Sequence, residues 1–304
     1  MTEKKPVRHM TPPKSVGEAL WRLRWTLARR TVQLGILLLF AGTARLGWQI
    51  AGEPVLDGTL SASKFLGLIP LSDPLAMLER LAAGHLPTVT VLAGALIVLV
   101  LYGILGSRTF CGWVCPMNMV TDLADWLRRK LGLDADVVRL TNVVRYGLLA
   151  ASIVMSVLLG TAAFEAVSPQ AWLWRDLVFG TGLAALAAAS AVFAIDLALM
   201  KHGWCGHICP LGAFWALVGR LTRSPGIQVH FKDDACTRCG DCLRVCPEPQ
   251  VIRFNDLKKT GRIPAGECLN CGRCIANCPE KALQFALFKK APAQNPVRKQ
   301  GEKS

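Results

Sequence analysis

The sequence has few acidic residues: 21 Asp and Glu stand against 35 Lys and Arg in 304 residues, which gives a formal net charge of +14. An excess of this kind also occurs in nucleic-acid-binding proteins. Here, however, the basic residues gather beside apolar segments, as the positive-inside rule predicts for a membrane protein. We therefore interpret the charge as a sign of membrane topology and expect no nucleic-acid partner.

The sequence also has no cysteine outside a motif, since eight of its twelve cysteines form one run and four form a repeated pair. The run, from Cys236 to Pro279, reads C-x2-C-x2-C-x3-C-P twice, which is the two-cluster pattern of bacterial ferredoxins. Structural zinc sites favour paired C-x2-C modules without a third cysteine at this spacing, and disulfides need an oxidising compartment. The run therefore predicts two 4Fe-4S clusters.

The ligands of each cluster follow from the crossed pattern of this motif. Three cysteines of a C-x2-C-x2-C turn close on one cluster, and the fourth cysteine of the run ligates the other cluster. The first cluster is thus assigned to Cys236, Cys239, Cys242 and Cys278, and the second to Cys246, Cys268, Cys271 and Cys274. Crossed ligation joins the two halves of the domain.

Apolar residues make up 52% of the sequence, more than is usual in a soluble domain of this size. Four apolar segments approach the roughly 20 residues that a helix needs to cross a bilayer. They cover residues 32–50, 89–105, 146–164 and 177–200. No small-residue cleavage site follows the first segment, so we expect an uncleaved membrane helix there and no signal peptide.

The basic residues of the connections predict the orientation of these helices. Eight Lys and Arg precede the first helix, two lie in residues 51–88, and seventeen follow Met200. Both termini are therefore expected on the cytoplasmic side of a bacterial inner membrane. The predicted fold is membrane all-α, with four transmembrane helices in two pseudo-repeated hairpins, followed by a cytoplasmic two-cluster bacterial ferredoxin-like α+β domain.

Composition divides the chain into four predicted parts. They are a basic cytoplasmic segment (1–30), a four-helix transmembrane domain (31–224), the ferredoxin domain (225–288) and a tail (289–304) rich in Lys, Pro, Gln and Gly. A tail of this composition buries too little apolar surface to fold, so we expect disorder there.

The motif C-x3-C-P occurs twice, each time after an even-numbered apolar segment. It supplies Cys111, Cys115, Cys205 and Cys209. Cysteines four residues apart on a helical turn point the same way, and the proline suits a helix break after each pair. We therefore expect the two pairs to face each other across the bundle. Four thiols at one level suit a metal, a further cluster or a dithiol cycle, and simple packing of buried cysteine is the alternative.

Two histidines flank the second of these motifs. His202 precedes Cys205 by three residues, and His207 lies between Cys205 and Cys209. Either imidazole can ligate a metal or donate a hydrogen bond to a ligand. Both are therefore candidates for a site at the C-x3-C-P cysteines.

Arg45, Asp196 and His85 are further candidates. Arg45 and Asp196 lie inside apolar segments, where a charge costs at least a few kcal/mol. Snorkelling to the interface would explain both, and a role in quinone or proton handling is the alternative. His85 follows an expected interfacial helix capped near Ser72 or Asp73, where it either accepts a proton from quinol or lies at the headgroup boundary. His85 and Arg45 are the residues we select for quinol handling.

Several segments together carry a resemblance to a known family. They are Gly84-His85-Leu86-Pro87, Phe110 to Pro116, Thr121 to Ala124, His202 to Pro210 and Val245 to Pro249. These segments resemble the NapH family, the membrane ferredoxin-type proteins of the periplasmic nitrate reductase system. The resemblance implies a quinol dehydrogenase subunit in the lipid bilayer. It also implies that electrons pass to a NapG-like iron–sulfur protein, with a NapC-like c-type cytochrome as a further partner. Nothing in the sequence suggests a molybdenum site, so nitrate is not expected to react here.

Two other functions share this chemistry or architecture. Ferredoxin-type proteins with C-x3-C-P motifs also assist the assembly of copper oxidases, to which they would deliver reducing equivalents or metal. Those proteins are typically longer and carry an added periplasmic domain. A MauN-like protein of methylamine metabolism would perform the same electron transfer with another partner. Because only a short tail follows the clusters here, electron transfer from quinol is the preferred reading.

Overall fold

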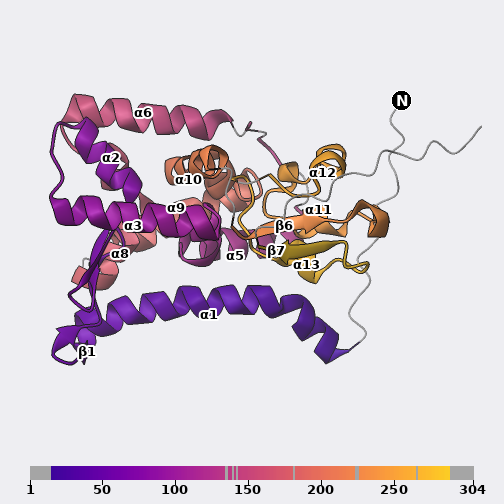
Figure 1. Ribbon diagram of the computed structural model, residues 1–304, viewed down its shortest axis with the longest axis horizontal. Helices are drawn as coiled ribbons and strands as arrows, with labels where there is room; N and C mark the ends of the chain where they lie inside the picture. The colour runs from indigo at the N-terminus through magenta and orange to yellow at the C-terminus, as the bar shows by residue number, and fades with distance from the viewer. Residues whose placement is uncertain are drawn as a thin grey trace, which may run out of the picture.

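The structure is a computed structural model that describes residues 15–133, 136–138, 140–141, 143–180, 182–222, 226–264 and 266–287. These residues form a larger helical part, from α1 to α10, and a smaller ferredoxin part, from β6 to β7, at opposite ends of the long axis (Figure 1). The first fourteen residues of the predicted basic segment, and the predicted tail at 289–304, lie outside the described residues.

The helical part contains ten α-helices, one π-helical turn and five short strands in the described residues. In chain order they are α1 (Val16–Leu46), β1 (Gln49–Ile50), β2 (Glu53–Pro54), β3 (Leu56–Thr59), β4 (Ala62–Phe65), β5 (Ile69–Ser72), α2 (Pro74–Ala82), α3 (Val89–Leu105), α4 (Thr109–Trp113), α5 (Met117–Lys130), α6 (Val143–Leu159), α7 (Ala163–Val167), α8 (Pro169–Phe179), α9 (Ala184–Ala198), the π-helical turn η1 (Trp204–Ile208) and α10 (Pro210–Leu221). The helix breaks expected after each C-x3-C-P pair are present, since α5 and α10 begin at or just after the two prolines.

Local chemistry fixes several helix ends. Ser15 begins α1 by accepting a hydrogen bond from the backbone N–H of Glu18 at 3.2 Å. Asp73 is the N-cap of α2, as the sequence predicts, and its Oδ1 accepts from the backbone N–H of Leu75 at 2.8 Å. Pro74 occupies the first turn of α2, where its missing N–H costs no hydrogen bond.

The prediction of four transmembrane helices is wrong, because no helix in the described ranges is both long and apolar enough to cross a membrane. Helices α3 and α6 have 17 residues each and α9 has 15, all short of the roughly 20 required. Gly180, at φ 76°, ends α8 and divides the apolar segment 177–200. The longer α1 carries Arg29, Arg30 and Arg45.

The core of the helical part surrounds Trp215, which is 1% exposed. Its ring lies 5.3 Å from the ring of Tyr102 and 5.3 Å from that of Phe214. Leu75 and Met117, from α2 and α5, belong to the same buried cluster. The antiparallel sheet β3–β4–β5 joins this core through β5, which packs on α3. Four helices and a small sheet thus meet at one point.

The ferredoxin part is held by one pair of strands and short helices between them. Strand β6 (Gln228–Phe231) pairs antiparallel with β7 (Leu283–Ala286), so the two ends of this part lie side by side. Between them lie η2 (Asp233–Ala235), α11 (Asp241–Val245), η3 (Pro249–Val251), α12 (Phe254–Thr260) and α13 (Arg273–Ala276). Val229, Leu257 and Ile263 are at most 2% exposed and form its core.

Buried ion pairs join the two parts. Arg108, before α4, donates from Nη1 and Nη2 to the two carboxylate oxygens of Glu248 at 2.8 and 2.5 Å, and both side chains are almost fully buried. Arg145 on α6 pairs with Glu267. On the other side, Asp122 on α5 accepts from Arg273 of the ferredoxin part. Removing one member of such a pair costs about 3–5 kcal/mol, so these contacts fix how the two parts sit.

Candidate iron–sulfur centres

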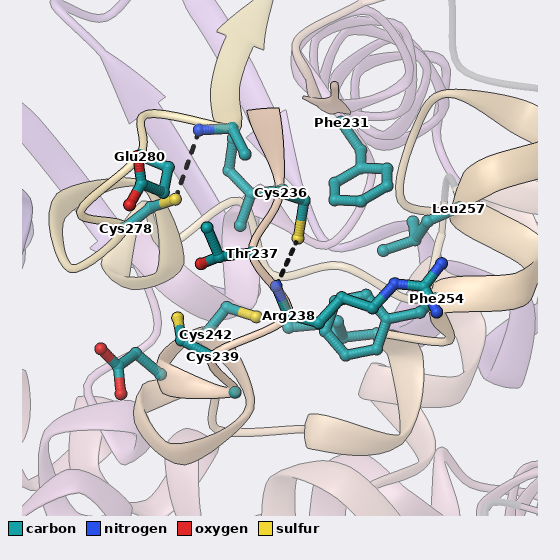
Figure 2. Close-up of a pocket in the computed structure, with 15 residues that line it drawn as sticks. Phe231, Cys236, Thr237, Arg238, Cys239, Cys242, Phe254, Leu257, Cys278 and Glu280 are labelled. Atoms are coloured by element: carbon teal, nitrogen blue, oxygen red, sulfur yellow. Dashed lines mark hydrogen bonds between the residues drawn. The ribbon is translucent and has the colours of Figure 1, made fainter. Parts of the chain in front are cut away.

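The four cysteines assigned to the first cluster line one cavity of the ferredoxin part. This cavity of about 20 Å³ lies between Cys236, Cys239, Cys242 and Cys278, with Phe231, Phe254 and Leu257 on one side (Figure 2). Three of the cysteines come from the loop before α11 and from its first turn, and Cys278 comes from beyond α13. The structure therefore brings together the crossed set, and a four-thiolate set of this kind is what a 4Fe-4S cluster requires.

The four cysteines assigned to the second cluster line a matching cavity. It encloses about 20 Å³ between Cys246, Cys268, Cys271 and Cys274. Glu248 also lines this cavity, and its carboxylate pairs with Arg108. The helical part therefore contacts the wall of the second cavity directly.

The backbone of both motifs curls in the same way around the cysteines. Arg238 and Asn270, at equivalent positions, have φ values of 55° and 50°, which cost non-glycine residues energy. In that conformation the N–H of Arg238 donates to Cys236 Sγ at 3.4 Å, and the N–H of Asn270 donates to Cys268 Sγ at 3.4 Å. Donors aimed at sulfur stabilise the thiolate that ligates iron, so the backbone fits the predicted clusters.

The four C-x3-C-P cysteines line a third cavity, in the helical part. It encloses about 20 Å³ between Cys111, Cys115, Cys205 and Cys209. Cys111 lies on α4, Cys115 follows it, Cys205 lies on η1 and Cys209 is the N-cap of α10. Apolar side chains, among them Phe164 and Trp204, close the cavity. The two motifs therefore meet, as their repetition suggests.

Burial governs the protonation of these thiols. It raises the pKa of Cys111 to about 12, and it raises the pKa of Cys115, Cys205 and Cys209 above the ordinary value. In the ferredoxin part, burial also raises the pKa of Cys268 to about 12. Thiols in such surroundings stay protonated and unreactive unless a metal stabilises the thiolate.

Neither candidate histidine lines the C-x3-C-P cavity. His202 is 1% exposed, and its Nε2 lies 3.7 Å from a carboxylate oxygen of Asp122 and 3.7 Å from one of Asp125. His207 lies in η1, where burial lowers the pKa of its imidazole. His202 thus belongs to the ion-pair cluster around Asp122, at the junction of the two parts.

A cavity that sequence reasoning missed lies beside the C-x3-C-P cysteines. It encloses about 200 Å³, and its wall is mostly apolar, including Ile36, Val98 and Leu101. Asp73 and Tyr102 bring polar groups to it, and we call it the Asp73 cavity. The sequence marked Asp73 only as a helix cap, because the residues that form the cavity with it are far apart in the chain.

Asp73 has an unusual environment for a carboxyl group. Burial above all, together with the carboxylates of Glu165 and Glu79, raises its pKa from 3.8 to about 7, although the backbone hydrogen bond from Leu75 lowers it. Burial also raises the pKa of Glu165 and of Glu79. Asp73 can therefore exchange a proton near neutral pH.

The other candidates lie away from this cavity. His85 is exposed, and its Nε2 is 3.0 Å from the backbone oxygen of Gly160. Arg45 donates to the backbone oxygens of Leu177 and Asp176, both at 2.9 Å. Asp196, whose pKa burial raises to about 6, accepts from the backbone N–H of Trp204 at 2.9 Å. The structure does not bring His85 and Arg45 together.

Comparisons with known proteins match both parts of the chain. A 4Fe-4S dicluster domain family matches residues 228–279, and a 4Fe-4S binding domain family matches residues 87–134 and 181–228. The ferredoxin-type protein NapH of Escherichia coli is 43% identical over 77% of this chain and 78% of its own length. The methylamine utilization ferredoxin-type protein MauN of Methylobacillus flagellatus is 41% identical over 80% of this chain and 83% of its own length.

The chain belongs to the NapH–MauN family of ferredoxin-type proteins. NapH of Haemophilus influenzae, at 43% identity over 76% of the chain, supports the same membership. No solved structure matches the chain. Membership confirms the NapH resemblance and a ferredoxin-type electron-transfer protein with 4Fe-4S domains. In this NapH–MauN protein, one 4Fe-4S binding match covers each C-x3-C-P motif.

Proposed function

We propose that this NapH–MauN protein oxidises a quinol and passes the electrons to a NapG-like iron–sulfur partner. Bound 4Fe-4S clusters supply the one-electron redox chemistry. One observation carries the proposal: the Asp73 cavity adjoins a cysteine cavity, because Phe110 and Val114 line the first while their neighbours Cys111 and Cys115 line the second. A quinol in the Asp73 cavity would therefore lie next to the cysteine sites.

The Asp73 cavity has the groups that quinol oxidation needs. Conversion of a quinol to a quinone breaks two O–H bonds and releases two protons and two electrons. The two electrons would pass to 4Fe-4S clusters held by the cysteines of this chain. The Asp73 carboxylate takes the protons in turn, since it can hold and release a proton near neutral pH. The apolar wall receives the ring and the tail of the quinol.

Polar contacts link the backbone of Asp73 to Glu165, a second acid beside the cavity. The backbone N–H of Asp73 donates to the backbone oxygen of Ser61 at 2.9 Å, and the Ser61 hydroxyl donates to Glu165 at 2.6 Å. Glu165 in turn lies 3.7 Å from the half-exposed guanidinium of Arg175.

The partner surface we propose is a basic groove beside the predicted clusters. The groove lies between α1, α5 and the ferredoxin part. It contains Arg22, Arg30, Arg129, Arg244 and Arg273, and Asp122, which pairs with Arg30 and Arg273. Val245 and Asn277, which also line it, adjoin Cys246 and Cys278. An acidic patch on an iron–sulfur partner, or on a NapC-like cytochrome, would complement this charge. The resemblance to MauN supports the same chemistry with a different partner.

An anaerobic redox titration followed by EPR tests the proposal. Potentials of iron–sulfur clusters span roughly −700 to +450 mV, so the protein environment decides the outcome. We expect at least one cluster to titrate near the potential of the quinone couple. If every cluster titrated several hundred millivolts below that couple, quinol could not feed them, and a reductant or assembly role for another metalloenzyme would replace the proposal.

A further inference from the structure

We propose that Cys111, Cys115, Cys205 and Cys209 bind a third 4Fe-4S cluster, in the helical part of the protein. All four line one cavity, although the two pairs are far apart in the sequence. Four cysteine thiolates form the usual ligand set of a 4Fe-4S cluster. The 4Fe-4S binding domain match covers both pairs but assigns no ligand.

The cavity matches the two ferredoxin cavities. Each of the three is lined by four cysteines and encloses about 20 Å³. The cysteines of the two ferredoxin cavities have the spacing of 4Fe-4S ligands. The third cavity therefore offers a cluster the same four thiols, and a zinc ion with four sulfurs at about 2.3 Å is the alternative that a metal count decides.

A buried hydroxyl at the cavity lacks a protein partner. Ser168 is 0% exposed and lines the cavity, and its Oγ makes no hydrogen bond to any described residue. An unpaired buried hydroxyl costs about 1–3 kcal/mol. A cluster sulfur in the cavity would accept its proton, as sulfurs in other iron–sulfur sites do. The orphaned donor thus points to an acceptor within the cavity.

A buried arginine links this cavity to the second ferredoxin cavity. Arg108 Nη2 donates to the backbone oxygen of Cys205 at 3.2 Å and to Glu248 at 2.5 Å, and Nη1 donates to the backbone oxygen of Glu267 at 2.8 Å. Cys205 belongs to the third cavity, whereas Glu248 lines the second. The positive charge of Arg108 also stabilises an anionic cluster ligated by thiolates.

A cluster in this cavity would lie between the Asp73 cavity and the second ferredoxin cavity, and it would be the first electron acceptor. Phe110 and Val114 separate it from the Asp73 cavity on one side, and Gly112 packs against the backbone of Leu269 on the other. This relay role rests on the proposed quinol oxidation. The binding of the cluster itself does not.

Counting iron tests the third cluster. The full chain, purified anaerobically, is expected to hold about twelve irons and twelve acid-labile sulfides. Cys209→Ser is expected to lower both counts to about eight, and Cys209→Ser combined with Cys239→Ser to about four. Met117→Leu is the control, because Met117 lines the same cavity without a thiolate, and it should keep about twelve.

Three results would overturn this inference in the unsubstituted chain: about eight irons with four titratable thiols, about ten irons, or about eight irons with one zinc. The count on the unsubstituted protein decides the question even if Cys209→Ser does not fold. Quinol enters none of these measurements. If quinol oxidation failed, the proposal of a third cluster would therefore be unaffected. If the iron count were eight, the proposal of quinol oxidation would be unaffected.

Discussion

Asp73→Asn is expected to slow the reduction of the clusters by quinol about 10²- to 10⁴-fold, the usual loss when a general base is removed. Asparagine caps a helix as well as aspartate does, so α2 and its hydrogen bond to Leu75 should survive. Stopped-flow absorbance of the clusters after anaerobic mixing with quinol measures the rate. Asp57→Asn, an exposed acid outside the cavity, is the matched control and should leave the rate unchanged.

The pKa of Asp73 also predicts how the rate of cluster reduction changes with pH. Only the ionised carboxylate accepts a proton, and the pKa of Asp73 is about 7, so the wild-type rate should rise with pH up to about 7 and then level off. Glu165 and Glu79 face Asp73 and move its pKa in the same direction as burial. The rate of the Asp73→Asn variant should not show this rise with pH. A variant that kept the wild-type rate and profile would show that another group takes the proton.

The pH dependence of the free energy of unfolding tests the pKa of Asp73 independently of any activity. The folded-state pKa of Asp73 lies above its unfolded value of 3.8, so the folded state binds the proton more tightly. The stability contribution of that proton is present at low pH and is lost as pH rises from about 4 to about 7. The wild-type free energy of unfolding should therefore fall over this window, and Asp73→Asn should remove that part of the slope.

Cys239→Ala is expected to remove the first cluster completely and to lower the iron content by about four per chain. Crossed ligation makes a sharper prediction: Cys278→Ala should remove the same cluster, although Cys278 belongs to the second motif. Iron and sulfide counts with EPR of the remaining clusters compare the two variants. Thr237→Ala is the control, because Thr237 lines the same cavity without a thiolate.

Two outcomes would contradict the ligand assignment. In the first, Cys278→Ala leaves the spectrum of the first cluster intact and removes that of the second. In the second, Cys239→Ala retains all of its iron. Cys246→Ala and Cys271→Ala provide the reciprocal pair, since the assignment predicts that both remove the second cluster.

Local patterns in the sequence predicted what depends on a few neighbouring residues. The spacing of the ferredoxin cysteines identified two sets of four, and each set lines one cavity. The expected helix over 89–105 matches α3 at both ends, and Asp73 caps α2 as expected. These features follow from turn geometry and capping, which act over a few residues.

Features that depend on helix length or on distant contacts were predicted less well. Apolar content alone suggested four membrane helices, but Gly180 divides the segment 177–200, and Gly160, at φ 65°, follows the end of α6. The Asp73 cavity draws on residues from α1 to α10, so no window of sequence contains it. Ser168 becomes a candidate hydrogen-bond donor only because the fold places it beside cysteines from two other segments.

The most direct test of the central claim is to mix the oxidised protein with a quinol under anaerobic conditions and to follow cluster absorbance and EPR. The account predicts bleaching of the clusters, with one quinone formed for each two electrons that the clusters gain. Dithionite, as a control, should bleach the same clusters without quinol. If dithionite reduced every cluster and quinol reduced none, the proposal that this chain oxidises quinol would be contradicted.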